Sequence, residues 1–144
     1  MQLRDEFPMD RPIRLRATTR DGAIRELVLE LVKVDALSAD RVDDCVKALV
    51  EREKYGSTGI GSGVAIPHAR LPFSAEMMCS LGVSVKGLDW KALDGGPVFV
   101  VFLMLSGAKP SGRTLEALAT VSRLVRDDPD FLHSLRDDHD PDMT

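Results

Sequence analysis

The most constraining feature of the sequence is an unbroken run of eight apolar residues from Val98 to Leu105. A run of this length is too short for a membrane span, which needs about 20 residues. Short apolar runs of this kind are typical of a β-strand at the centre of a sheet that is covered on both faces. The run therefore predicts a layered domain in which other elements pack on both sides of a sheet.

Two amphipathic helices are predicted ahead of this strand. The first has Thr18 or Thr19 as its candidate cap, and the second follows Ser38, another favourable capping residue, and ends near Gly56. Each carries apolar residues at the spacing of one helix face. The two stripes are Ile24, Leu27, Val28, Leu31 and Val32, and Val42, Cys45, Val46, Leu49 and Val50.

Shorter patterns predict the remaining elements. Apolar and polar side chains alternate over residues 79–85, which indicates a half-buried strand. We expect short strands at 64–66 and, at a sheet edge, around Ile13 and Leu15. A further helix is expected over 115–125, and a shorter helical segment over 129–135.

This order of elements predicts an α/β fold, a mixed β-sheet flanked by helices on its faces. A single domain over residues 1–144 accounts for the whole chain, with its core at about 10–136. The acidic segment 137–142 has few apolar residues, so we expect the C-terminal tail to be frayed.

Charge and cysteine content exclude several classes of function. The 19 basic and 23 acidic residues give a net charge of -4, which provides no overall attraction to a nucleic-acid backbone. Cys45 and Cys79 have no companions at metal-binding spacing, and the N-terminus lacks the apolar core of a secretory signal. We therefore expect a cytoplasmic protein with reduced thiols, no metal, no cofactor and no direct insertion into a membrane.

The segment 56–63 contains four glycines. Consecutive N–H groups in such a loop can cradle an anion, but a connecting loop that needs tight turns accounts for the glycines as well. No Gly-Lys-Ser/Thr sequence closes a P-loop here, and the spacing of a dinucleotide fingerprint is missing. The glycines leave both interpretations of the loop open. The absence of these two motifs excludes nucleotide binding.

His68 follows Pro67, which fixes its own φ angle and favours an extended conformation before it. The imidazole is thus presented from a stiff segment, and a neutral imidazole nitrogen is a competent nucleophile toward phosphorus. The alternative is a histidine whose ring simply hydrogen bonds to a backbone carbonyl at a loop edge. His133 and His139 have the character of surface histidines, and we assign them no role.

The end of the second helix adds two charged candidates. At the helical period, Glu53 continues the apolar stripe and Arg52 lies on its flank. A charged pair placed toward the core is costly unless it is paired or used in a site. The alternative is that the helix has left the core by this point and ends in solvent.

Together these segments resemble the enzyme IIA domains of the phosphoenolpyruvate-dependent sugar phosphotransferase system, of the fructose/mannitol and nitrogen-regulatory type. The resemblance rests on Arg52-Glu53, on 57–61 and on 63–70, in that order, and extends more weakly over most of 10–136. It implies a mixed sheet flanked by helices, which agrees with the fold predicted from the patterns.

The resemblance also implies a function. His68 would accept a phosphoryl group from the phosphohistidine of HPr or of a nitrogen-branch equivalent, and sugar-specific members pass the group to a cysteine of a IIB domain. Arg52 would stabilise the phosphoryl charge. Hydrogen bonds or support would come from Thr58, from the loop glycines Gly59, Gly61 and Gly63, and from Glu53, Arg70 and Arg113.

The sequence departs from the family at Thr114, where a second histidine commonly lies before the Leu115-x-x-Leu118 pattern. Threonine donates one neutral hydrogen bond and cannot become a cation, so phospho-His68 should be less stabilised unless Arg113 compensates.

Two hypotheses follow. The first is a phosphocarrier, and the lack of an attached transporter segment favours the nitrogen-regulatory branch, although a separate IIB domain would leave the sequence unchanged. The second is a IIA-like binding module that has lost transfer and regulates a sensor kinase or transporter by contact alone.

Overall fold

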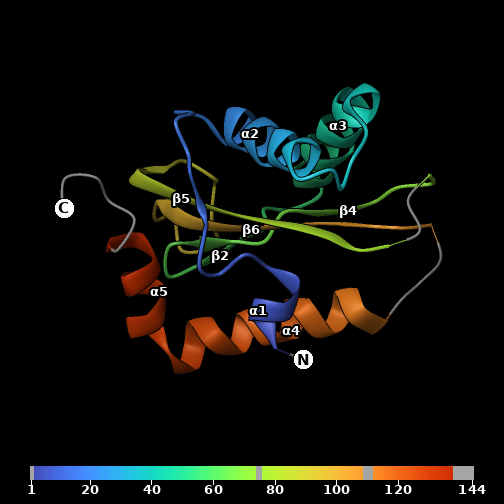
Figure 1. Ribbon diagram of the computed structural model, residues 1–144. Helices are drawn as coiled ribbons and strands as arrows, with labels where there is room; N and C mark the ends of the chain where they lie inside the picture. The colour runs from blue at the N-terminus through green and yellow to red at the C-terminus, as the bar shows by residue number, and fades with distance from the viewer. Residues whose placement is uncertain (1, 74–75, 109–111, 138–144) are drawn as a thin grey trace.

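The computed structural model describes residues 2–73, 76–108 and 112–137, and it has three layers. A mixed β-sheet forms the middle layer (Figure 1). Helices α2 (Arg20–Lys33) and α3 (Val42–Glu53) cover one face. Helices α1 (Leu3–Glu6), α4 (Gly112–Asp127) and α5 (Pro129–Asp137) cover the other. The α/β fold predicted from the order of elements is confirmed.

The strand predicted from the apolar run organises the sheet. It is β6, Val98–Ser106, and it pairs antiparallel with β5, Met78–Leu88, and parallel with β3, Val64–Ala65, and β4, His68–Arg70. The edge strand β1, Ile13–Arg14, adds to β5, and β2, Gly59–Gly61, adds to β3. Because helices cover both faces of the sheet, most side chains of β6 are buried on both faces.

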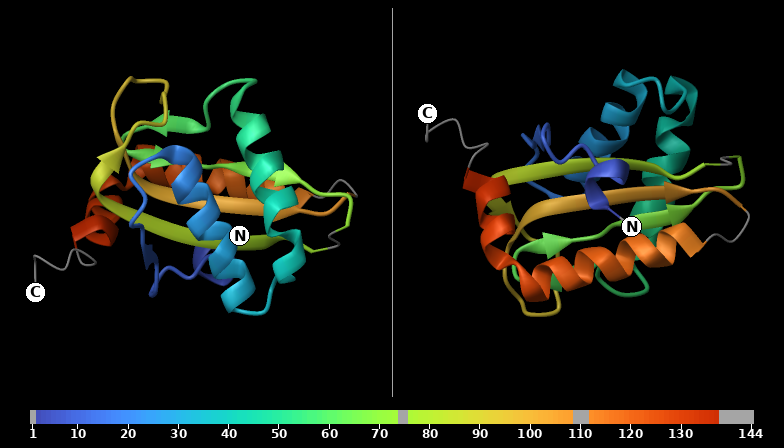
Figure 2. Two further views of the ribbon diagram at one scale, coloured as in Figure 1. Left: turned by 90° about the horizontal axis from the view of Figure 1, so that it is seen from above. Right: turned by 60° about the horizontal axis from the view of Figure 1, so that its bottom comes forward.

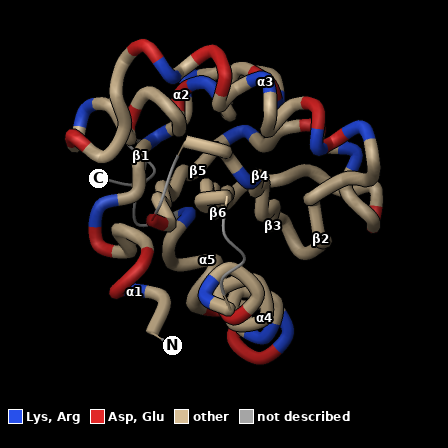
Figure 3. The backbone as a smooth tube through the Cα atoms, turned by 90° about the vertical axis from the view of Figure 1, so that its right-hand side faces the viewer, with Lys and Arg blue, Asp and Glu red and all other residues tan. Residues whose placement is uncertain are grey.

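Side chains of β6 alternate between two apolar cores. Val101, Leu103 and Leu105 join the core under α2 and α3, whereas Val100, Phe102 and Met104 join the core under α4 and α5. Figure 2 shows α2 and α3 crossing one face of the sheet and α4 lying along the other. Figure 3 shows the charged residues over the outer helices and loops, with the strand layer between them mostly uncharged.

Both helices predicted before the central strand are confirmed. Thr19 caps α2, since its side-chain oxygen accepts a hydrogen bond from the Gly22 N–H at 3.1 Å. The role predicted for Ser38 is wrong: it precedes the short 3₁₀ helix η1, Ala39–Arg41, and its hydroxyl donates to Asp40 instead of capping α3.

The half-buried strand predicted at 79–85 is also wrong. The strand β5 is buried on both faces at its centre, because α2 packs closely over its small residues and the Ser80 hydroxyl donates to the Leu27 carbonyl. On α4, Leu115 is 71% exposed, whereas Ala117 and Val121 face the sheet. Residues two apart on a helix lie about 200° apart, so the burial of Ala117 turns Leu115 toward solvent.

Other short elements agree with the patterns or extend them. Strands β1 and β3 and helix α5 lie where they were expected, whereas β2, β4 and α1 were not predicted. The frayed tail expected at 137–142 falls almost entirely outside the described residues. None of the helices within the described ranges has the length and apolarity needed to cross a bilayer.

Candidate functional site

His68 is the first residue of β4, and its position is fixed by backbone hydrogen bonds to the central strand. It pairs with Met104 of β6, and the Met104 N–H donates to the Pro67 carbonyl at 2.9 Å. Met104 belongs to the core under α4, and paired residues on adjacent strands point to the same face. The partly buried His68 side chain therefore lies on the α4 side of the sheet.

The imidazole of His68 makes one hydrogen bond that determines its tautomer. Its Nδ1 lies 2.8 Å from the Ile66 carbonyl oxygen. A carbonyl can only accept, so Nδ1 carries the proton. In the neutral ring, Nε2 then keeps its lone pair and is the nucleophilic nitrogen.

Arg52 comes from the last turn of α3 and is partly buried. Its Nη1 donates to the Gly56 carbonyl at 2.8 Å, which holds the guanidinium over the loop that leaves the helix. Helix α3 packs beside β4, but on the sheet face opposite to the His68 side chain. The guanidinium of Arg52 can therefore approach the imidazole only around the edge of the sheet.

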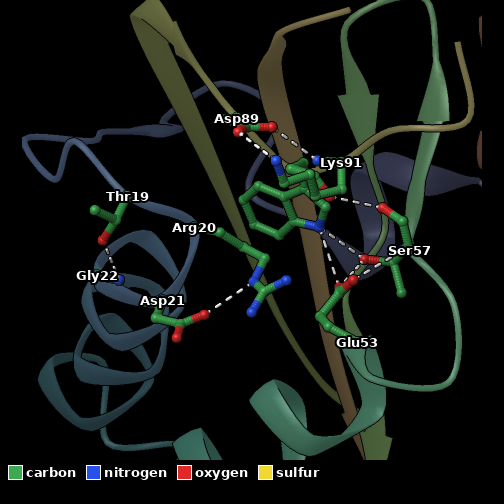
Figure 4. Close-up of polar contacts among 10 residues, drawn as sticks. Thr19, Arg20, Asp21, Gly22, Glu53, Ser57, Asp89 and Lys91 are labelled. Atoms are coloured by element: carbon green, nitrogen blue, oxygen red, sulfur yellow. Dashed lines mark hydrogen bonds and ion pairs between the residues drawn. The ribbon is translucent and has the colours of Figure 1, made fainter. Parts of the chain in front are cut away.

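Glu53, the next residue, is 7% exposed and continues the buried face of α3. Of the two alternatives that its spacing allowed, a charge toward the core and a helix end in solvent, Glu53 follows the first. Its carboxylate accepts hydrogen bonds from the Thr58 N–H at 2.9 Å, from the Thr58 hydroxyl, and from Trp90 Nε1 at 3.1 Å. Trp90 Nε1 also lies 3.0 Å from the Thr58 hydroxyl oxygen. Figure 4 shows Glu53 and Ser57 beside the indole ring. The buried carboxylate is thus paired with donors on three sides.

This network continues to the imidazole. The Thr58 carbonyl accepts the Ile66 N–H at 2.9 Å, and the Ile66 carbonyl accepts the Nδ1–H of His68. A chain of hydrogen bonds therefore runs from Glu53 at the end of α3 to the ring of His68. Because Thr58 is 4% exposed and uses both its N–H and its hydroxyl on Glu53, it supports the site through this chain.

The loop glycines serve the backbone in two ways. Gly59 lies in β2 against Ala92, where an added Cβ would be 2.8 Å from the Ala92 Cβ. Gly61 and Gly63 have φ angles of 97° and 80° in the turn between β2 and β3. Tight turns and close packing account for all three positions.

An acidic residue fixes the turn of this hairpin. Asp94 Oδ2 accepts the Ser62 N–H at 3.1 Å, and Asp94 Oδ1 accepts the Gly96 N–H at 3.0 Å. These two backbone donors hold the pKa of Asp94 below its usual range.

Two candidates lie at the start of α4, and Figures 1 and 2 place this end of α4 and the end of β4 at the same end of the molecule. The partly buried Thr114 directs its hydroxyl to the sulfur of Met77 at 3.9 Å. Arg113 Nη2 donates to both carboxylate oxygens of Glu6, at 2.7 and 2.6 Å. Arg70 is exposed and, two residues after His68 on the same strand, points to the same side of the sheet.

Sequence reasoning missed three residues that shape this region: Trp90, Asp94 and Glu6. Trp90 is the only tryptophan of the chain and is fully buried, and a lone aromatic residue with an N–H donor was a usable signal. Asp94 and Glu6 act on residues far away in the sequence, and no local pattern marks them. Within the described ranges, no three His, Cys, Asp or Glu side chains gather in a way that could hold a metal ion.

The arrangement defines a class of protein: an α/β domain that presents a stiffly held, partly buried histidine at the start of a short strand. Residues 12–143 match the family described as "Phosphoenolpyruvate-dependent sugar phosphotransferase system, EIIA 2". The chain therefore belongs to the enzyme IIA family of the phosphotransferase system, as its sequence motifs indicated.

Similar proteins carry names from both branches of that system. A nitrogen regulatory protein from Bradyrhizobium diazoefficiens is 33% identical over 88% of this chain and 80% of its own length. A fructose-specific EIIA component from Haloferax volcanii is 36% identical over 73% of this chain and 67% of its own length. The crystal structure of nitrogen regulatory protein IIA-Ntr from Neisseria meningitidis superposes with a TM-score of 0.79 at 26% identity, over 99% of this chain and 90% of that one.

Proposed function

We propose that this domain is a phosphocarrier that accepts a phosphoryl group on Nε2 of His68 from the phosphohistidine of an HPr-like carrier protein. The observation that carries the proposal is the hydrogen bond from Nδ1–H to the Ile66 carbonyl, which leaves Nε2 as the free nucleophile. Membership of the enzyme IIA family supports the reaction class.

The transfer balances without a moving proton. The P–N bond to the carrier's imidazole breaks as the bond from phosphorus to Nε2 of His68 forms, and each imidazole keeps its other N–H. The phosphorylated ring carries positive charge, which the Ile66 carbonyl stabilises through the Nδ1–H. Phosphoryl transfer depends mainly on in-line positioning and on charge stabilisation, and the rigid segment before His68 supplies the first.

Arginines would supply the charge stabilisation. We assign Arg52 as the main stabiliser of the phosphoryl oxygens, because α3 packs beside β4 and a guanidinium can hydrogen bond to two of these oxygens at once. Arg70, on the His68 face of β4, is a supporting cation. The role of Glu53 and Thr58 is to fix the end of α3, and the role of Gly59, Gly61 and Gly63 is to bring the hairpin against its neighbours.

The test is phosphorylation in a defined system. The protein is incubated with phosphoenolpyruvate, enzyme I and HPr or its nitrogen-branch equivalent, and intact mass is used to detect one acid-labile, base-stable phosphate. We expect a label that disappears in His68→Ala. A label that survives this substitution refutes the assignment of His68.

Arg52 is tested in the same system with a matched control. Arg52→Gln should lower the rate of labelling at least tenfold, the effect of losing a charge-assisted contact worth about 1.4 kcal/mol. Lys54→Gln removes a charge two residues away, where Lys54 pairs only with Glu51 among the described contacts, and should leave the rate unchanged. Equal effects of the two substitutions would contradict the role of Arg52.

The alternative is a IIA-like module that regulates a partner by contact alone, and Thr114 in place of the second histidine is the observation that favours it. Failure of every carrier to label the protein would support this alternative. We place the carrier in the nitrogen-regulatory branch, following its similarity to nitrogen regulatory proteins. The downstream partner would then be a sensor kinase or transporter, and transfer to a IIB domain would instead indicate the sugar branch.

A further inference from the structure

A second cation lies on the same sheet face as His68, and in this structure an acidic residue holds it. Arg113, at the start of α4, pairs with Glu6, the last residue of α1. The side chain of Glu6 is 15% exposed and that of Arg113 is 56% exposed. Glu6 is therefore held mostly within the protein, whereas more than half of the Arg113 side chain is exposed to solvent.

The register of the sheet places this ion pair near His68. Cys79 of β5 pairs with Met104, and Met104 pairs with His68, so the three residues form one row across the sheet. Adjacent strands are about 4.8 Å apart, which puts Cys79 about 10 Å from His68. Glu6 and Arg113 both lie close enough to Cys79 to act on its thiol, since Glu6 raises and Arg113 lowers its pKa, which burial alone has already raised. Thr114, the residue after Arg113, contacts Met77, the residue before β5, so the ion pair lies at the end of the sheet where β5 begins, near this row.

A phosphoryl group on His68 would compete with Glu6 for this cation. A protein-bound phosphate carries a charge of about -1.5 to -2, compared with -1 for a carboxylate, and offers three acceptor oxygens. Arginine donates two parallel hydrogen bonds to either kind of group. The stronger anion on the same face should therefore draw the guanidinium away from Glu6.

We infer that Arg113 exchanges partners: it pairs with Glu6 in the unphosphorylated protein and contacts the phosphoryl oxygens once His68 is phosphorylated. Glu6 is then a positioning residue that sets the availability of Arg113, and it acts on phospho-His68 only through Arg113. This inference rests on His68 as the acceptor, but it does not depend on which carrier donates the group.

The test uses a chemical donor so that no carrier protein is involved. Potassium phosphoramidate phosphorylates imidazole: its P–N bond breaks, ammonia leaves, and the bond from phosphorus to Nε2 forms. After removal of the reagent, ³¹P NMR follows the loss of phospho-His68 at neutral pH, and the His68→Ala variant identifies its signal. A cation that pairs with the phosphoryl oxygens of phospho-His68 stabilises the phosphorylated protein, so the contact of Arg113 is expected to lengthen this lifetime.

Four variants decide the outcome. Arg113→Gln should shorten the lifetime about three- to tenfold, as expected for loss of a charge-assisted hydrogen bond. Glu6→Gln should lengthen it, because the carboxylate that hydrogen bonds to Arg113 is gone. Arg123→Gln removes a charge from the exposed face of the same helix and should have no effect. In the double variant, Glu6→Gln should add nothing to Arg113→Gln.

The last comparison separates this exchange from a general effect of charge. If Glu6 acted directly on the phosphoryl group, its substitution would lengthen the lifetime equally in both backgrounds, and the inference would be overturned. Equal lifetimes for Arg113→Gln and Arg123→Gln would overturn it too. If Glu6→Gln perturbs folding, as Trp90 fluorescence would report, Arg113→Lys provides the second test, because a retained charge without the fork should give an intermediate lifetime. Failure of both phosphoramidate and carrier to modify His68 would instead refute the proposed function itself.

Discussion

Replacement of Thr58 by valine tests whether the buried network at the end of α3 stabilises the site. Valine preserves the shape of threonine but removes the hydroxyl that donates to Glu53, a carboxylate that is 7% exposed. A hydrogen bond to a charged group contributes about 1.5–3 kcal/mol, and the remaining donors from the Thr58 N–H and Trp90 keep the carboxylate from being unpaired. We therefore expect a loss of about 2 kcal/mol in the free energy of unfolding.

The assay is urea unfolding followed by the fluorescence of Trp90, the single tryptophan, which is fully buried beside the substituted residue. The melting temperature should fall by roughly 5–10 °C for a domain of this size. Thr120→Val is the matched control. The Thr120 hydroxyl donates to the Glu116 carbonyl and accepts from Arg123, both in exposed contacts within α4, so the substitution should change stability by less than about 0.5 kcal/mol. A Thr58→Val variant no less stable than this control would refute the network as a source of stability.

Three further substitutions test separate contacts. Gly59→Ala should cost about 1–3 kcal/mol in urea unfolding, because its Cβ would lie 3.0 Å from the Ala92 Cα, whereas Gly112→Ala, with open space around it, should cost nothing. Asp94→Asn should destabilise the protein at neutral pH. Since folding lowers the pKa of Asp94, the stability that the ionised carboxylate contributes is present above the unfolded pKa and is lost as pH falls through the folded pKa. The parent protein and the variant should therefore have the same stability in acid. Thr114→His should lengthen the lifetime of phospho-His68 in ³¹P NMR, since imidazole can donate a hydrogen bond as a cation; an unchanged or shorter lifetime would count against the role of that position.

The longest elements were predicted because their own length fixes their structure, whereas β1 and β3, with two residues each, were expected only from short apolar patterns. The apolar run at Val98–Leu105 and the stripe of α2 each bury a continuous face, so local periodicity was sufficient. Strands β2 and β4 have three residues each, too few for a period, and they form because they pair with neighbours that are already in the sheet. Their position was therefore not available from local sequence.

Local sequence predicted some residues of the candidate site but not the residues that contact them. His68 stood out because Pro67 stiffens its backbone, and Glu53 because it continued an apolar stripe. The partners of these residues were not visible: Trp90 is 37 positions from Glu53, and Glu6 is 107 positions from Arg113. Such pairs depend on how the layers stack, which a local pattern does not encode.

The candidate site draws residues from both helix layers, because side chains of the sheet alternate between its two faces. His68 points toward the α4 layer, whereas Arg52 comes from the α3 layer and must reach it around the sheet edge. The hydrogen-bond chain that orients the imidazole starts at Glu53 in the α3 layer. The imidazole itself lies on the sheet face that carries Arg113 of the α4 layer. Neither layer alone can build the site, so phosphoryl acceptance should depend on the packing of both helix pairs onto β6 and not only on the segment that carries His68.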